Sequence, residues 1–296
     1  MEQKFKSLSL FEFQEKFPDE DACLSYLSKE KWKFGFVCPN CGHTKYCSAI
    51  RIYDRQCTKC NRVTSPTAGT LFHKVKFSIL KSFYIVYFLS TNKKGITSTE
   101  LSRKLSLRQK TCWLFKRKVM TAMKSSGNNK IETNSEVDET VVGAQEEDVV
   151  GRKNNKKRLV VFAIEKKGRG VSRLYGKVIQ HSSSKELGAF MKDTLSADCK
   201  IKTDKWSGYT PLKADFKNLT QIYSGEKGNN FPELHRAIMI FKAWLRGVHH
   251  SVRDLQSYID EYTYRFNRNF MKENIFDNLM ARMIAENPQT YKQVIS

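Results

Sequence analysis

The sequence has no apolar run near the roughly 18 to 20 residues that a membrane-spanning helix needs, and no secretory signal peptide opens it. It is also short of acid: 30 Asp and Glu residues stand against 52 Lys and Arg, for a formal net charge of +22. The first absence predicts a soluble cytoplasmic protein without membrane association. The second predicts a polyanionic partner, for which nucleic acid is the default.

A disulfide framework is missing too, because the eight cysteines include two Cys-x-x-Cys pairs and four scattered residues, which fits thiolate metal ligands in a reducing compartment. Four thiolates about 2.3 Å from one Zn²⁺ complete a closed site, which folds a short segment and leaves no position for catalysis. We predict one structural zinc in a zinc ribbon at 31–68, with His43 and Cys47 as weaker alternative ligands. The expected ligands are Cys38, Cys41, Cys57 and Cys60.

The rest of the first half is expected to be helical. Residues 1–30 predict a cap of two short helices, and Phe77–Leu89 predicts a buried helix within a region at 69–124. There, Thr99–Leu105, N-capped by Ser98, and a second helix at 108–123 follow each other across a tight turn, as in a helix-turn-helix motif. A generic helical unit with a solvated basic face is the alternative. The candidate DNA-binding residues of the second helix are Arg108, Lys110, Lys116 and Arg117.

A second pattern begins after a turn-rich linker at 125–134. Three β-rich segments, a serine-capped helix at 182–195 and a fourth β-rich segment predict an α/β domain at 135–270, with a mixed sheet flanked by helices. The basic loop at 151–158 supplies two candidate phosphate contacts, Arg152 and Lys153. The expected strands are 136–142, 159–164, 174–179 and 200–203.

Two aspartates stand out by position. Asp138 lies inside the first strand, and Asp204 directly follows the fourth. Buried carboxylates need a partner or a metal, and two of them on neighbouring strands favour divalent cations that activate a water or a 3′ hydroxyl. Strand alternation places Glu139 on the face opposite Asp138, so we expect only one of these two to join Asp204. An Asx-turn is the simpler explanation for Asp204.

The segment 231–250 predicts a helix of about four turns that begins near Pro232. Its apolar residues recur every three or four positions and define a face that packs on a core. His235 and Lys242 are seven residues apart, hence only about 20° apart around the helix. By themselves they would be an ordinary boundary histidine and a solvated lysine. The expected apolar face consists of Leu234, Ile238, Phe241, Leu245 and Val248.

Taken together, these motifs resemble the zinc-ribbon transposases of bacterial insertion sequences, the ISXO2-like (IS1595) group. The resemblance extends from about Cys38 to Asn269. It is carried, in chain order, by the two Cys-x-x-Cys pairs, GTLFH, the paired helices, SEVDETVVG, TDKWSGY, the helix with His and Lys seven apart, HHSV and YRFNRN.

The resemblance implies an RNase H-like catalytic domain with a DDE-type triad followed by a basic residue. It assigns Asp138 and Asp204 to the first two positions, His235 to the third, in a DDH variant, and Lys242 to a DNA phosphate contact. His235 replaces the usual acid, and an imidazole ligand favours Mn²⁺ over Mg²⁺. Glu233 is the alternative third ligand, although it lies about 200° away around the helix.

The implied partners are the double-stranded inverted-repeat ends of an insertion sequence and its target DNA, bound by a homodimer or larger assembly at the bacterial nucleoid. Arg265 and Arg268 resemble family residues that grip phosphate, though a solvated helix end explains them equally well. Residues 271–296 predict a helical tail. Two other functions remain open at this point: a non-catalytic DNA-binding protein and a structure-selective nuclease of the same fold.

Overall fold

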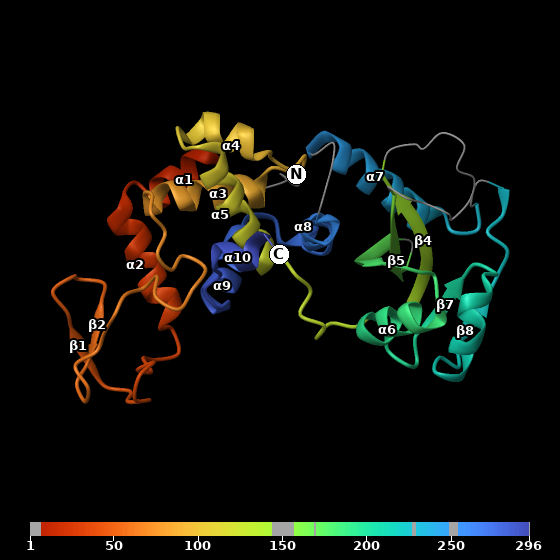
Figure 1. The fold of residues 1–296 in the computed structure, drawn as a ribbon, viewed down its shortest axis with the longest axis horizontal. Helices are drawn as coiled ribbons and strands as arrows, with labels where there is room; N and C mark the ends of the chain where they lie inside the picture. The colour runs from red at the N-terminus through yellow and green to blue at the C-terminus, as the bar shows by residue number, and fades with distance from the viewer. Residues whose placement is uncertain (1–6, 144–156, 169, 227–228, 249–253, 296) are drawn as a thin grey trace, which may run out of the picture. The chain divides into compact units, whose positions relative to one another are not determined.

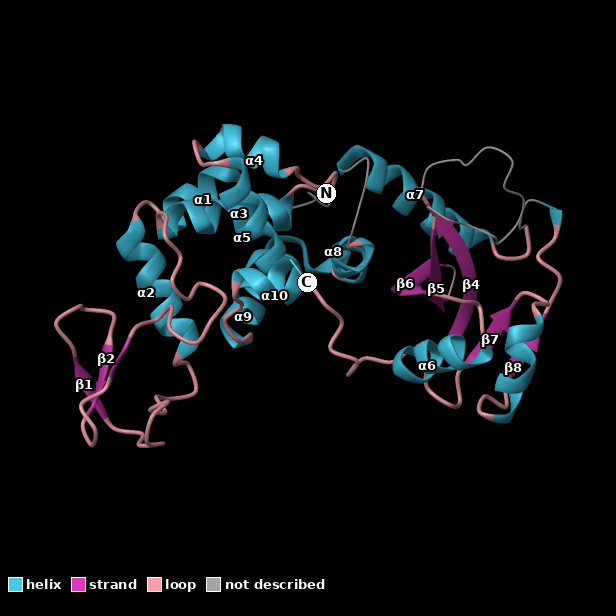
Figure 2. Cartoon of the chain, viewed as in Figure 1, coloured by secondary structure: helices cyan, strands magenta, loops and turns pink. Residues whose placement is uncertain are grey.

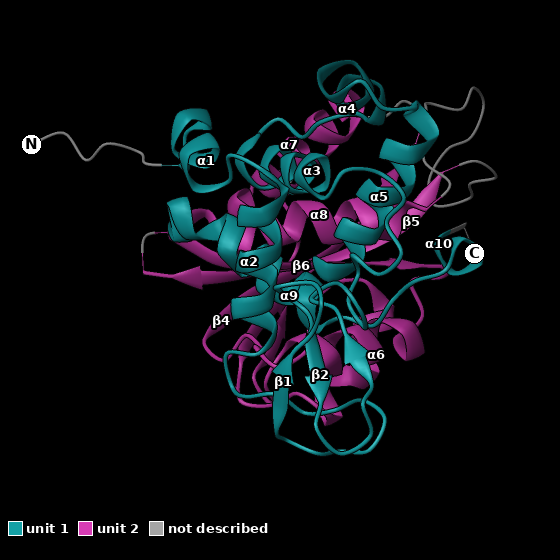
Figure 3. Cartoon of the chain, turned by 90° about the vertical axis from the view of Figure 1, so that its left-hand side faces the viewer, with its two compact units in different colours: residues 1–123, 270–296 teal, residues 124–269 magenta. Residues whose placement is uncertain are grey.

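In the computed structural model the chain divides into two compact units, residues 1–123 with 270–296 and residues 124–269 (Figure 3). No helix in the described part of the chain is long and apolar enough to cross a membrane. The structure describes residues 7–143, 157–168, 170–226, 229–248 and 254–295 (Figure 1).

The first unit begins with helices and a small antiparallel sheet. Along the chain, the sheet comes after Trp32 and Phe36, and these two aromatic side chains pack against Cys38 and Cys57. The guanidinium of Arg55 lies 4.3 Å from the ring centroid of Trp32 and 4.1 Å from that of Tyr46, so cation–π contacts tie the sheet to the preceding helix. These elements are α1 (Leu10–Lys16), α2 (Glu20–Lys31), β1 (Tyr46–Ser48), β2 (Arg55–Cys57) and β3 (Val63–Thr64).

The helices of the first unit enclose an aromatic core that includes residues from both ends of the chain. Phe276 of the C-terminal segment packs on Phe13, Phe17 and Phe83, with ring centroids 5.6 to 6.3 Å apart. All four rings are fully buried. The sequence predicts only a helical tail at 271–296, but this segment is part of the aromatic core. The remaining elements are α3 (Ile79–Thr91), α4 (Ser98–Leu105), α5 (Gln109–Ala122), the 3₁₀ segment η3 (Asn269–Asn274), α9 (Ile275–Ala285) and α10 (Tyr291–Ile295).

Helices α4 and α5 are joined by the tight turn that the sequence predicts. Ser106 adopts a left-handed conformation (φ 50°) and ends α4, and its backbone N–H donates to Ser102. The N-cap of α4 is Thr97, whose hydroxyl accepts from the backbone N–H of Glu100. The prediction that Ser98 caps this helix is therefore wrong by one residue, because Ser98 is already the first helical position.

The second unit contains the mixed sheet flanked by helices that is typical of an RNase H-like fold (Figure 2). The strand order is β6-β5-β4-β7-β8; the β4–β5 and β5–β6 pairs are antiparallel, and β4–β7 and β7–β8 are parallel. The sequence prediction missed the short last strand. The strands are β4 (Asn134–Val142), β5 (Arg158–Lys167), β6 (Gly170–Ile179), β7 (Lys200–Thr203) and β8 (Leu219–Gln221).

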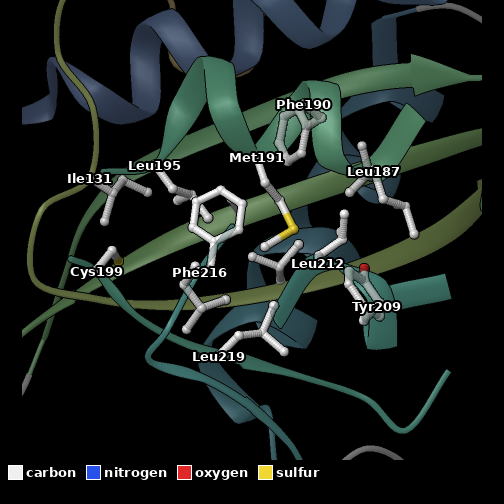
Figure 4. Packing of buried hydrophobic residues seen from close by; sticks show 14 of the residues in the cluster. Ile131, Leu187, Phe190, Met191, Leu195, Cys199, Tyr209, Leu212, Phe216 and Leu219 are labelled. Carbon is white, nitrogen blue, oxygen red and sulfur yellow. The ribbon is translucent and has the colours of Figure 1, made fainter. Parts of the chain in front are cut away.

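One face of the sheet, here called the α6 face, is covered by α6 (Ser184–Thr194) and the 3₁₀ segment η1 (Ser207–Ala214). Ser183 caps α6, since its hydroxyl accepts from the backbone N–H of Glu186. Figure 4 shows Phe190 and Met191 of α6 and Leu212 of η1 in one apolar cluster, which continues with Val137 and Ile201 of the sheet.

The opposite face, here called the α7 face, is covered over β4, β5 and β6 by α7 (Pro232–Val248) and α8 (Leu255–Asn267). All five residues of the predicted apolar face of α7 are buried. Phe241 packs on Phe162 of β5 at 5.4 Å between ring centroids. The ring of Phe162 occupies the space beside Gly176 of β6, where a Cβ atom would lie only 2.6 Å from it. Only glycine fits there.

The edge strand β6 is capped by amide side chains of α8. Asn267 accepts from the backbone N–H of Leu174 at 2.7 Å and donates to its carbonyl at 3.0 Å. Gln256 accepts from Val178 N–H at 2.8 Å and donates to the Gly176 carbonyl at 3.2 Å. These hydrogen bonds replace those that a neighbouring strand would make. They satisfy backbone N–H and C=O groups of the edge strand and oppose its pairing with another chain.

We expect Asn267→Ala to lower the free energy of unfolding by about 1 to 3 kcal/mol, because the buried Leu174 backbone loses both partners. Asn269→Ala, at an exposed position two residues away, is the matched control and should stay within about 0.5 kcal/mol of wild type. Denaturant unfolding measures both values. Equal stabilities would show that the edge cap contributes nothing.

Candidate active site

The site forms at the carboxyl end of β7, where the parallel neighbouring strand β4 continues beyond it. Strand β7 pairs with β4 only from Asn134 to Val137, and β4 continues to Val142. Asp138 is thus the first β4 residue beyond the pairing, and Asp204 is the first residue after β7. Parallel pairing brings their carboxylates to the same edge, as predicted.

Asp138 is held from two directions. Its Oδ1 accepts from the backbone N–H of Glu139 at 2.8 Å, and its Oδ2 lies 2.9 Å from Nε2 of His235 on α7. Burial raises the pKa of the Asp138 carboxyl, the hydrogen bond with His235 opposes this rise, and the nearby carboxylate of Asp204 raises the pKa further. Without a cation the site therefore disfavours the ionised form of Asp138.

Glu139 also joins the cluster. Carboxylate oxygens of Asp138, Glu139 and Asp204 all lie within 4.8 Å of one another. The prediction that only one of the adjacent acids could join Asp204 is wrong. The two side chains do have partners on opposite faces, but β7 has ended at this height, so Asp204 can approach both.

On the α6 face, Glu139 accepts a hydrogen bond at 3.0 Å from the hydroxyl of Tyr209, a fully buried residue of η1. Burial and the nearby acids raise the pKa of Tyr209 well above its usual value, so it stays a neutral donor. Asp204 also forms the predicted Asx-turn, in which its Oδ1 accepts from Trp206 N–H at 3.1 Å. The sequence did not predict Glu139 or Tyr209 as site residues, although Tyr209 belongs to the same TDKWSGY motif as Asp204.

Helix α7 presents His235 and Lys242 to the same strand, as their seven-residue spacing predicts. Lys242 is half-buried; its ammonium donates to Thr140 Oγ1 at 2.7 Å, and burial, then Arg246, lowers its pKa. Glu233 faces elsewhere and pairs with Lys166 at 3.5 Å. The group of potential metal ligands within 4.8 Å of one another consists of three acids and does not include His235. His235 contacts one of these acids, Asp138.

The second cluster of metal-ligand residues is in the zinc ribbon. Sγ of Cys38 lies 3.6 Å from that of Cys60, and the same distance separates Cys41 and Cys57. A tetrahedron with Zn–S bonds of 2.3 Å has S–S edges of about 3.8 Å, so the four thiols fit a structural zinc. His43 contacts Thr58 instead. Cys47 is exposed and outside the cluster.

The predicted DNA-binding residues have different surroundings. Arg108 and Lys110 are exposed at the start of α5, and Arg117 is partly exposed. Lys116 does not belong with them: it is buried, and its ammonium donates to the Ile96 carbonyl at 2.8 Å.

In the second unit, Arg265 forms a bonded pair with the buried Glu261 at 2.8 Å, so it serves packing rather than an open phosphate contact. Arg268 stacks over the Tyr264 ring at 4.1 Å. The predicted phosphate contacts Arg152 and Lys153 lie outside the described residues.

Comparison with protein-family models gives two matches. Residues 131–267 match the ISXO2-like transposase domain, and residues 18–63 match the transposase zinc-ribbon domain. Together they span more than half of the chain and share one family. The protein belongs to the ISXO2-like (IS1595) transposases, with an N-terminal zinc ribbon and a DDE transposase domain. A comparison with curated proteins found no match.

Family membership implies DNA binding and DNA transposition in general terms. The residues present also fit a divalent cation, because three partly buried carboxylates converge and the pKa of one of them, Asp138, is raised. Hard oxygen ligands of this kind suit Mg²⁺ or Mn²⁺.

We expect Cys60→Ser to lose the ribbon zinc, since three thiolates no longer close the tetrahedron. Cys47→Ser removes a thiol from the same ribbon, outside the cluster, and should retain one zinc per chain. Metal analysis of the purified variants, with limited proteolysis of the ribbon, distinguishes them. Equal zinc contents would contradict this ligand set.

We expect Asp138→Asn to raise the free energy of unfolding at pH 7 by about 0.5 to 2 kcal/mol when no Mg²⁺ or Mn²⁺ is added. The folded-state pKa of Asp138 is raised, so its contribution to stability is present below the unfolded pKa and is lost as the pH rises through the folded value. An amide carries no charge and removes that loss. Asp193→Asn, on an exposed acid, is the control. Denaturant unfolding at pH 7 that finds Asp138→Asn destabilised would refute this account.

Proposed function

We propose that this protein is a DNA transposase that binds the terminal inverted repeats of an insertion sequence and catalyses metal-dependent strand cleavage and strand transfer. The observation that carries the proposal is the convergence of Asp138 and Asp204 at one end of the sheet, with His235 2.9 Å from Asp138. In this proposal the zinc ribbon and the α4–α5 pair recognise the ends, and unit 124–269 carries out the chemistry.

Asp138 and Asp204 would hold the catalytic cations, with His235 as the third ligand in a DDH variant of the triad. When bound, Mg²⁺ or Mn²⁺ activates the attacking oxygen and stabilises the leaving oxygen of a phosphodiester. The protein's own contribution is to fix the carboxylates: His235 and the Glu139 N–H orient Asp138, and the Trp206 N–H orients Asp204.

The surroundings of Glu233 support His235 as the third ligand. Lys166 lies 3.5 Å from Glu233 and 3.0 Å from the buried Glu136, so Glu233 already takes part in a charge cluster away from Asp204. His235 instead contacts a carboxylate of the acidic cluster directly. In this proposal Lys242, two turns further along α7 and facing the same strand as His235, contacts a phosphate near the scissile bond.

We expect His235→Ala to lower strand transfer by about 100-fold, because the third metal ligand and the hydrogen bond that orients Asp138 are lost together. Glu233→Ala should keep activity within a few-fold of wild type. The assay uses DNA with matching element ends in Mg²⁺ and in Mn²⁺, alongside end binding by gel shift.

The opposite ranking of these two variants would assign the ligand to Glu233. A wild-type protein that binds ends tightly but yields no product would instead point to a non-catalytic DNA-binding protein. Cleavage of branched DNA without end preference would indicate a structure-selective nuclease.

A further inference from the structure

The second unit has a basic cavity on the strands that carry the acidic cluster. It measures about 610 Å³ and lies over β4, β7 and β8. Its charged lining residues are Glu136, Lys166, Lys200, Lys202 and Lys217. We call Lys200, Lys202 and Lys217 the lysine track.

The register of the sheet explains why these lysines are exposed. Lys200 pairs with Asn134 and Lys202 with Glu136, and paired residues point to the same face. Glu136 bonds to the backbone of Leu234, so this is the α7 face. Helix α7 packs on β4 and β5, and no described helix packs on β7 or β8 at this face. The alternating residues of β7 are buried on the α6 face instead.

The electrostatic balance of the cavity favours an anion. Its acid, Glu136, is buried and already paired with Lys166 at 3.0 Å, and Glu233 shares the same lysine. Within the described part of the chain, the ammonium groups of the lysine track form no hydrogen bond or ion pair. The three ammonium groups of the lysine track, with no acid paired to them among the described residues, repel one another, and a polyanion offsets that repulsion.

The lysine track leads to the acidic cluster. Lys200 and Lys202 alternate along β7, so they lie on the same side about 7 Å apart, and Asp204 directly follows the strand. Lys217 lies beside them, just before β8. A strand of nucleic acid lying along β7 would therefore meet two cations before it reaches the carboxylates.

We infer that the lysine track binds the phosphodiester backbone of the DNA strand that enters the acidic cluster. Binding is through phosphate charge and carries no base specificity, because lysines on an open sheet face reach only the backbone. The inference rests on the proposed function for the statement that this DNA is the substrate; the binding surface itself rests on the cavity and its charges.

The test compares three full-length triple variants. Lys200→Ala/Lys202→Ala/Lys217→Ala removes the track, and the corresponding Lys→Arg triple keeps its charge. Lys185→Ala/Lys192→Ala/Lys213→Ala removes three exposed charges from α6 and η1, on the opposite face. Affinity for a labelled duplex is measured by fluorescence anisotropy between 50 and 200 mM salt, values chosen to span a strong change in screening.

We expect the track-to-Ala variant to reduce the slope of log Kd against log salt by about three, or about one per lost phosphate contact. The Arg variant and the α6-face variant should keep the wild-type slope. Thermal melting of all variants checks that the fold is intact. An unchanged slope for a folded track-to-Ala variant overturns the inference, and so does an equal loss for the α6-face variant.

Two activity assays identify which DNA lies on the track. If the track-to-Ala variant loses cleavage at an element end, the DNA on the track is the element strand. If it loses only the joining of a pre-cleaved end, the DNA on the track is target DNA. If wild type neither cleaves nor joins but the slope still falls by about three, the proposed catalytic function fails and the binding surface stands.

Discussion

The parallel pairing of β4 and β7 is the constraint on which the site depends. Because β7 ends beside Val137, the next residue of β4 and the first residue after β7 are both acids at one edge of the sheet. The fold thereby brings together Asp138, Glu139 and Asp204, which repel one another. Such an arrangement lowers stability unless hydrogen bonds and cations compensate for the repulsion, and that cost is typical of a catalytic centre.

Each face of the sheet supplies part of that compensation. His235 approaches Asp138 from α7, and Tyr209 donates to Glu139 from the buried layer under α6. The acids are thus fixed by elements whose own positions depend on apolar packing, through Phe241 on one side and Leu212 on the other. Rigid supports of this kind keep ligand groups in place before substrate arrives.

Much of the fold follows from local pattern. Alternating β-branched residues define β4 and β5, and β7 agrees with its predicted bounds at both ends. The apolar spacing of α7 correctly gives its buried face. Strand β8, only three residues long, has too little alternation to be recognised, and its pairing with β7 supplies the missing signal. The burial of Lys116 was also hidden, because its partner is a backbone carbonyl twenty residues away.

The sequence by itself determined the four thiolates of the ribbon, through their Cys-x-x-Cys spacing, and the two aspartates, through their positions within and directly after predicted strands. It also determined the family, through the order of its short motifs. Only the tertiary structure decided what surrounds these residues. It brought Glu139 and Tyr209 into the acidic site and paired Glu233 with Lys166. Among the described helices, it packed none on the β7–β8 half of the α7 face. Those outcomes depend on where neighbouring strands end and which helix covers which strand, and no local spacing encodes either.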